Sequence, residues 1–221
     1  MERLEIRQKV LNENDRVAAA LRQRFAEQGT AVFNFISSPG SGKTMLLERT
    51  LERLPLGMNV AVLTGDIQTD NDARRLARAG YPVQQITTAG ACHLDARMIE
   101  RALANWPGEE FDLLLIENVG NLVCPTSYDL GEQAKIAVLS VTEGEDKPLK
   151  YPSAFFKSSA MILNKTDLLP WVPFDCKAAR ANARAIHPEI EIFETSCTSQ
   201  QGLAEWCEWL VAKVDARCVA A

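Results

Sequence analysis

The sequence predicts an α/β protein in which helices cover both faces of a mostly parallel central sheet. Two observations lead to this prediction. Short apolar runs alternate with segments of helical periodicity, and a loop rich in Ser, Pro and Gly follows the first apolar run. Strands that are apolar throughout, rather than at every second position, are typical of parallel sheets covered on both faces. A chain of 221 residues is long enough for one such domain.

The elements can be placed in order along the chain. Residues 3–28 are predicted to form an opening helix, because apolar residues recur there at helical spacing among many charges. The predicted strands cover residues 31–36, 59–64, 82–87, 111–116, 136–141, 159–164 and 190–193. The other predicted helices cover residues 44–54, 70–79, 94–104, 174–186 and 203–216. We expect an N-terminal helix, residues 1–30, packed on one domain, residues 31–221.

The composition argues against several classes of protein. The formal net charge is −5 and no basic block stands out, so nucleic acid is not an expected partner. No apolar run approaches the roughly 18 residues that span a bilayer, and the N-terminus lacks the apolar segment of a signal peptide. We therefore expect a cytoplasmic protein that does not enter membranes, whose six cysteines are thiols rather than disulfides.

The loop after the first strand, residues 37–44, is typical of a phosphate-binding loop. The general pattern is G-x-x-x-x-G-K-[ST], and here Ser37 occupies the position of the first glycine. The loop lies between a predicted strand and a predicted helix, as phosphate binding by backbone N–H groups and a helix N-terminus requires. This context favours a P-loop over an ordinary strand-to-helix connection. The predicted nucleotide contacts are Pro39, Gly40, Ser41, Gly42, Lys43 and Thr44, with Lys43 at the β/γ-phosphates and Thr44 on Mg²⁺.

A second motif, Asn164-Lys165-Thr166-Asp167, follows a later strand directly and predicts selection of guanine. The Asp167 carboxylate can accept two hydrogen bonds from the N1–H and exocyclic amine of guanine, a donor pair that adenine lacks. Asn164 can reach the other edge of the base. Ser196 and Cys197 follow the next strand, where a backbone N–H could meet the guanine carbonyl; an ordinary turn explains them equally well. Residues 31–221 are thus interpreted as a GTP-binding domain.

Carboxylates are predicted near the phosphates. Asp66 and Glu117 each follow an apolar strand, so both are expected at the sheet edge that carries the P-loop. They are candidates for binding Mg²⁺ or for orienting the attacking water. Asp70 and Asp72 lie where a γ-phosphate-sensing segment is expected, although helix capping explains either residue alone. Lys43, Asp66, Asp72 and Glu117 are the candidate catalytic residues, and slow intrinsic hydrolysis is expected because the sequence assigns no Gln or Arg to catalysis.

Cys92, His93 and Cys124 are candidate ligands for Zn²⁺ or Ni²⁺, because two thiolates and an imidazole suit these ions. Spacing alone favours packed thiols, since the chain has no C-x-x-C pair. Gly90-Ala91 and Pro125 indicate that both segments are loops, as a shared site would need. One chain offers three ligands, so a symmetric partner could supply a fourth.

The chain resembles the hydrogenase-maturation nickel-insertion GTPases of the HypB type, which belong to the SIMIBI class of P-loop GTPases and dimerise. The resemblance covers most of residues 32–203, and a Ser in the first P-loop position is common in that family. The segments that carry it are residues 37–44, 65–72, 91–96, 116–125, 141–152 and 164–167, among which Cys-His and Glu-Asn-Val-Gly-Asn-Leu-Val-Cys-Pro are the most specific.

The resemblance implies a homodimer that forms with GTP, and Ni²⁺ or Zn²⁺ bound by Cys92, His93 and Cys124 at the dimer interface. It also suggests that Lys150 of one subunit contacts the guanine of the other, although a solvated surface charge explains Lys150 as well. Some members carry an N-terminal Cys-rich or His-rich nickel site, whereas residues 1–30 of this chain contain neither Cys nor His. An N-terminal metal store is therefore not expected within these residues.

The resulting hypothesis is a GTP-hydrolysing metallochaperone that uses GTP/GDP, Mg²⁺ and Ni²⁺ or Zn²⁺. It would assist nickel insertion into the [NiFe]-hydrogenase large-subunit precursor together with hydrogenase accessory proteins. Three rival hypotheses remain: nickel delivery to urease, a P-loop kinase acting on a small molecule, and a zinc-stabilised binding module without turnover. The guanine motif argues against the kinase, and the run over residues 116–125 argues against urease.

Overall fold

The computed structural model describes residues 2–66, 71–88, 90–104, 106 and 110–218. Its centre is a seven-stranded sheet in the order β3-β2-β4-β1-β5-β6-β7, and each strand runs parallel to its neighbours. The strands are β1 (Ala31–Ser37), β2 (Val60–Asp66), β3 (Val83–Thr87), β4 (Leu113–Gly120), β5 (Ala134–Ser140), β6 (Ser158–Asn164) and β7 (Glu191–Glu194). The predicted fold class is confirmed.

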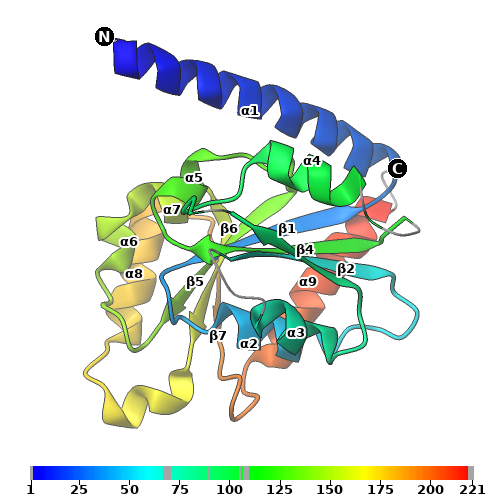
Figure 1. Ribbon diagram of the computed structural model, residues 1–221. Helices are drawn as coiled ribbons and strands as arrows, with labels where there is room; N and C mark the ends of the chain where they lie inside the picture. The colour runs from blue at the N-terminus through cyan, green and yellow to red at the C-terminus, as the bar shows by residue number, and fades with distance from the viewer. Residues whose placement is uncertain (1, 67–70, 89, 105, 107–109, 219–221) are drawn as a thin grey trace.

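Helices cover both faces of this sheet (Figure 1). One face carries α1 (Glu2–Glu27), α4 (Ala96–Ala104), α7 (Pro152–Phe156) and α8 (Cys176–Ile186). The other face carries α2 (Lys43–Leu51), α3 (Asn71–Ala77) and α9 (Leu203–Cys218). Four short helices were not predicted from the sequence: α5 (Cys124–Ser127), α6 (Lys147–Lys150), α7 and the 3₁₀ helix η1 (Thr166–Trp171). Within the described ranges, no helix is both long and apolar enough to cross a membrane.

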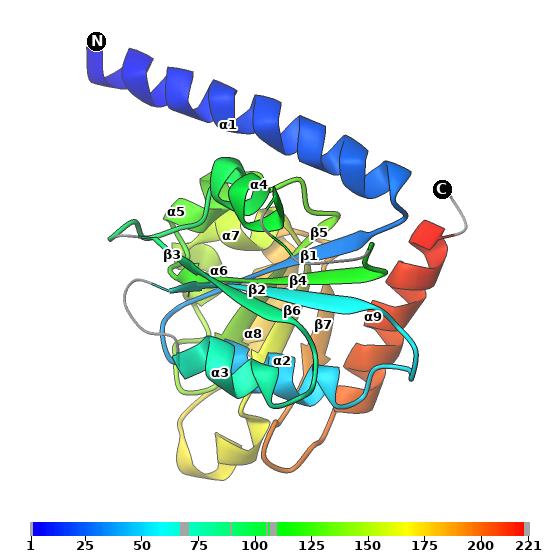
Figure 2. The same ribbon diagram turned by 45° about the vertical axis from the view of Figure 1, so that its right-hand side comes forward.

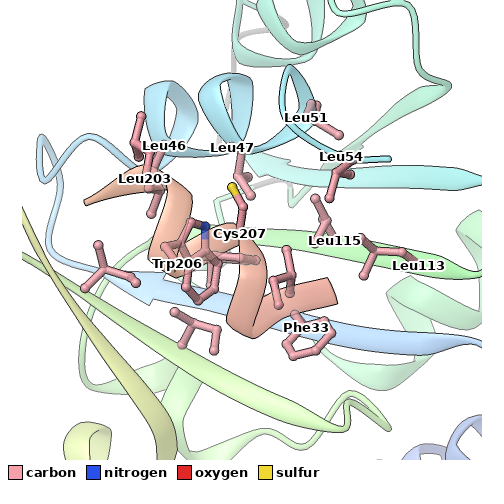
Figure 3. Packing of buried hydrophobic residues seen from close by; sticks show 14 of the residues in the cluster. Phe33, Leu46, Leu47, Leu51, Leu54, Leu113, Leu115, Leu203, Trp206 and Cys207 are labelled. Atoms are coloured by element: carbon pink, nitrogen blue, oxygen red, sulfur yellow. The ribbon is translucent and has the colours of Figure 1, made fainter. Parts of the chain in front are cut away.

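The core is organised by the alternation of side chains along the strands. Phe33 and Phe35 of β1 point to the face of α2 and α9, whereas Val32 and Ile36 belong to the clusters on the opposite face. Figure 3 shows α2 and α9 side by side over β1 and β4, with Trp206 at the centre of the contact. The apolar residues of α9 recur every three or four positions, which builds the face that covers the strands: Leu203, Trp206, Cys207, Leu210 and Val214.

The C-terminal half of α1 is part of the core. Val17, Leu21 and Phe25 are buried in one cluster with residues of α4 and the sheet. In both views the N-terminal half of α1 extends past the other elements (Figures 1 and 2). The buried amide of Asn14 joins α1 to two other segments, because it donates to the Asp129 carbonyl and accepts from the Ala96 N–H, both at 2.9 Å.

Two strands, β2 and β4, extend two or more residues past their predicted carboxyl ends. β2 continues through Asp66, so Gly65 and Asp66 lie in a strand rather than in a loop. β4 continues through Glu117 to Gly120, so Glu117 lies within the strand and does not end it. Periodicity missed this extension because polar residues follow the apolar run. These polar side chains are buried in the structure, where hydrogen bonds compensate for the loss of water. Nδ2 of Asn118, for example, donates to Oδ1 of Asn34 at 3.2 Å.

The carboxyl ends of β1, β4 and β6 meet at one edge of the sheet. The chain places β2, β3 and β4 on one side of β1, and then crosses β1 to place β5, β6 and β7 on the other side. Open α/β sheets bind their ligands in the crevice at such a switch point. The P-loop begins at this position.

Candidate nucleotide and metal sites

The P-loop has a backbone that only glycine adopts easily. Gly40 and Gly42 have φ angles of 75° and 93°, in the left-handed region. A Cβ atom on Gly42 would also lie 2.6 Å from the amide nitrogen of Asn164, so the second glycine is required for space as well. Helix α2 starts at Lys43, which directs its N-terminus at the loop. The loop therefore has the left-handed glycines and the following helix N-terminus that the prediction of a phosphate-binding loop requires, and its phosphate contacts stay a prediction.

Ser37, which replaces the usual first glycine, has a contact of its own. Its Oγ accepts a hydrogen bond of 2.7 Å from Nζ of Lys43. Burial lowers the pKa of Lys43, while the nearby carboxylate of Glu117 acts in the opposite direction. The serine therefore provides a polar partner for a buried ammonium group.

Glu117 and Thr44, for which a shared sheet edge was predicted, lie side by side. Thr44 Oγ1 donates to Glu117 Oε1 at 2.8 Å, and Glu117 Oε2 is buried without a hydrogen-bond partner among the described residues. Burial raises the pKa of Glu117 to about 7, although Lys43 and Thr44 favour its ionised form. A hydroxyl and a carboxylate with an unused buried oxygen fit the oxygen-ligand preference of Mg²⁺.

A cavity of about 530 Å³ joins these groups, and it is lined by residues 39–45, Gly65, Asp72, Arg75, residues 117–120 and Lys165. Asp72 lies in the first turn of α3 and faces this cavity. Arg75 was not predicted here, although a residue three positions after Asp72 on a helix shares its face. In the structure Arg75 forms an ion pair of 2.7 Å with Glu48. The side chain of Asp66 and all of Asp70 lie outside the described residues.

The guanine motif is attached directly to the P-loop. Asn164 donates to the Ser41 carbonyl at 3.0 Å, and Nζ of Lys165 donates to the Gly40 carbonyl at 2.7 Å. The Asn164 oxygen accepts from Thr195 Oγ1 at 3.2 Å. Asn164 therefore joins the P-loop to the segment after β7 in this structure, and its predicted contact with the base stays a prediction.

Asp167 lies beside the segment after β7. Its Oδ1 accepts a hydrogen bond of 2.7 Å from Oγ of Ser196, whose Oγ also accepts from the Ser199 N–H at 3.0 Å. Cys197 is buried, its thiol lies 3.5 Å from the Asn164 oxygen, and burial raises the pKa of this thiol to about 11. The four-residue motif and the residues after β7 thus form one hydrogen-bonded unit, and the predicted contact of Ser196 or Cys197 with guanine stays a prediction.

Two lysines follow β5. Lys150 is exposed and forms a 2.6 Å ion pair with Asp146, which raises the pKa of its ammonium group. Lys150 is not among the residues that line the nucleotide cavity. Lys147, which the sequence analysis did not select, donates to Ser38 Oγ at 3.2 Å. Within one chain, Lys147 rather than Lys150 is the lysine of this segment that contacts the P-loop.

The structure brings Cys92, His93 and Cys124 together. Their ligand atoms all lie within 4.8 Å of one another, and both cysteines are thiols. Cys92 and His93 lie in the loop before α4, as predicted, whereas Cys124 begins the short helix α5 rather than lying in a loop. The His93 ring stacks on Tyr128, with 3.9 Å between ring centroids, and burial lowers its pKa, which favours the neutral imidazole that binds metals.

Comparison with known proteins identifies the family of this chain. Residues 31–194 match the family described as CobW/HypB/UreG, nucleotide-binding domain. Hydrogenase maturation factor HypB of Azotobacter vinelandii is 53% identical over 207 residues, which cover 94% of this chain and 68% of that protein.

Two solved structures resemble the whole fold. HypB from Helicobacter pylori in complex with nickel is 41% identical with a TM-score of 0.87, over 92% of this chain and 96% of that one. Hydrogenase maturation factor HypB from Archaeoglobus fulgidus is 38% identical with a TM-score of 0.85, over 92% and 99%. The chain therefore belongs to the CobW/HypB/UreG family, as a member of its HypB group.

Proposed function

We propose that this protein is a GTP-hydrolysing metallochaperone that assists insertion of nickel into the [NiFe]-hydrogenase large subunit. One observation carries the proposal: the thiol and imidazole cluster of Cys92, His93 and Cys124 lies next to β4, and β4 also lines the nucleotide cavity. The nickel in the Helicobacter pylori HypB structure and the names of the relatives supply the cargo and the recipient.

The nucleotide half of the function rests on the residues around the P-loop. Lys43 neutralises the β/γ-phosphates, and Thr44 with Glu117 holds Mg²⁺, which supplies positive charge to the phosphates when bound. Asp167 accepts hydrogen bonds from guanine, while Asn164 and Lys165 hold the P-loop carbonyls. The buried hydroxyl of Ser41 has no hydrogen-bond partner among the described residues, so it is available to a phosphate oxygen.

Hydrolysis of GTP is assigned to the same cavity. Asp72 faces it, and Asp66 ends the neighbouring strand β2. Both remain candidates for orienting the attacking water. Arg75 is ion-paired with Glu48, so Lys43 is the main side chain that supplies positive charge to the phosphates. Slow intrinsic turnover follows, because an unassisted P-loop lacks the extra charge that speeds phosphoryl transfer.

The metal half of the function needs more than one chain. Cys92, His93 and Cys124 provide three ligands, whereas Zn²⁺ prefers four and Ni²⁺ four or more. A GTP-dependent homodimer supplies the remainder from a second copy. Val123, next to Cys124, is 60% exposed and offers apolar surface for that contact. Lys150, exposed on one subunit, reaches the guanine of the other.

Release of phosphate from GTP and from ATP, with and without Ni²⁺, tests the nucleotide half. We expect turnover with GTP that Lys43→Ala abolishes. A strong preference for ATP would instead favour a small-molecule kinase. Release at background level, even with Ni²⁺ and a hydrogenase precursor present, would favour a binding module without turnover.

Equilibrium titration with Ni²⁺ tests the metal half. We expect Cys124→Ala to lose most of the affinity, and Cys176→Ala, which changes a thiol at the start of α8, to bind as the wild type does. Unchanged affinity in Cys124→Ala would refute the ligand assignment. Nickel transfer to hydrogenase precursor, compared with transfer to urease apoprotein, then identifies the recipient.

A further inference from the structure

The end of β4 is packed against the P-loop. Asn121, the residue after β4, forms an isolated β-bridge with Ser37, the first residue of the loop. A Cβ atom on Gly120 would lie 3.0 Å from Cα of Pro39, so the two backbones approach closely there. Movement of the P-loop therefore acts directly on residues 120 and 121.

The side chain of Asn121 joins the two segments that carry the metal ligands. Its Nδ2 donates to the carbonyl of Cys92 at 3.3 Å. Its Oδ1 accepts from the N–H of Val123, the residue before Cys124, at 2.8 Å. One side-chain amide thus holds the backbone of one ligand and the backbone next to another.

The opposite side of this contact holds the lysine of the P-loop. Ser37, the bridge partner of Asn121, accepts the hydrogen bond from Nζ of Lys43. A P-loop lysine that binds phosphates must turn from this acceptor toward the nucleotide. The contacts therefore run without a gap from Lys43 through Ser37 and Asn121 to both metal-binding segments.

We propose that Asn121 is a positioning residue that transmits the nucleotide state to the metal cluster. The inference rests on the proposed function, since it takes Cys92, His93 and Cys124 as the nickel ligands. The amide fixes the separation of the Cys92 and Cys124 segments, and the bridge to Ser37 makes that separation depend on the P-loop. A cluster of two thiolates and an imidazole binds tightly in one separation and loosely in another, because metal–ligand distances vary little.

The inference predicts a specific failure in Asn121→Ala. Loss of the two hydrogen bonds lowers nickel affinity about fivefold to tenfold in the tighter nucleotide state. The ratio of nickel affinities between protein with GDP and protein with a non-hydrolysable GTP analogue moves toward one. GDP affinity of the metal-free protein stays close to that of the wild type, because Asn121 does not line the nucleotide cavity.

The experiment is a Ni²⁺ titration of the full chain, followed by thiolate-to-nickel charge-transfer absorbance, in each nucleotide state. Oligomer size is measured in parallel. Asn14→Ala is the matched control, since its amide also joins two backbone segments through one donated and one accepted hydrogen bond. We expect Asn14→Ala to keep the wild-type ratio even where its stability falls. Reciprocity gives a second readout, because Ni²⁺ must change the ratio of GTP-analogue affinity to GDP affinity by the same factor.

The outcomes separate the two proposals. A wild-type ratio in Asn121→Ala, or an equal loss in Asn14→Ala, overturns the role of Asn121. The role of Asn121 is also overturned if the wild type binds Ni²⁺ with equal affinity in both nucleotide states. It is overturned likewise if the affinity ratio changes in Asn121→Ala only because this variant no longer dimerises. Failure of the proposed function is a different result: nickel binding by the wild type that survives Cys124→Ala.

Discussion

Replacing Glu117 by glutamine should stabilise the protein free of nucleotide and Mg²⁺, and should do so only at neutral and alkaline pH. Burial raises the pKa of Glu117 from 4.5 to about 7, so the folded protein holds a proton that the unfolded chain has lost between these values. Stability from this group is present below pH 4.5 and falls as the pH rises to 7. Glutamine keeps the Oε1 acceptor for Thr44 but does not ionise.

The magnitude follows from the shift. A change of about 2.5 pKa units, at about 1.4 kcal/mol each, makes the variant about 3 kcal/mol more stable than the wild type at pH 8. At pH 4.5 the difference is below about 1 kcal/mol, because the folded wild type is then protonated at this position. For a chain of this size, about 3 kcal/mol corresponds to a rise in Tm of about 6–12 °C.

The assay is urea unfolding of both proteins at pH 4.5 and pH 8, after removal of nucleotide and metal with a chelator. All other titrating groups are shared, so the difference between the two proteins isolates residue 117. With GDP and Mg²⁺ added at pH 8 the order should reverse, because ligand binding stabilises the wild type more. The reasoning is refuted if the difference is the same at both pH values, or if Glu117→Gln is the less stable protein at pH 8 without ligand.

Three further changes test other contacts. Ser37→Ala should lower ligand-free stability by about 1–3 kcal/mol, because it removes the acceptor of the buried Lys43, and calorimetry should find a smaller loss with GDP and Mg²⁺ bound. Asp167→Asn should lower the affinity for GTP and raise the affinity for xanthosine triphosphate in competition binding, because the amide offers a donor where xanthine has a carbonyl. An unchanged preference would contradict the assignment of Asp167 to guanine. Trp206→Phe should cost about 1–3 kcal/mol in urea unfolding, because the buried indole donates to Thr50 at 2.9 Å, whereas Trp171→Phe, 83% exposed, should cost under about 0.5 kcal/mol.

Much of the fold could be predicted because its signals are local. A buried parallel strand such as 31–37 is apolar at nearly each successive position, and α9 shows its packed face every three or four residues. The P-loop needs glycines at fixed positions for backbone reasons that no distant contact changes. The length of β4 could not be predicted, because polar residues follow its apolar run and their burial depends on partners far away in the chain.

The amino-acid sequence by itself indicated the type of sheet, a loop with the phosphate-binding pattern, the Asn164–Asp167 motif and the residue types of the candidate metal cluster. Only the tertiary structure decided that Cys124 approaches Cys92 and His93, that Asn164 holds the P-loop, and that Asn121 joins the ligand segments. The reason is physical. Local periodicity and turn chemistry act over a few residues, whereas these contacts arise where the parallel order β3-β2-β4-β1-β5-β6 brings the carboxyl ends of distant strands to one edge.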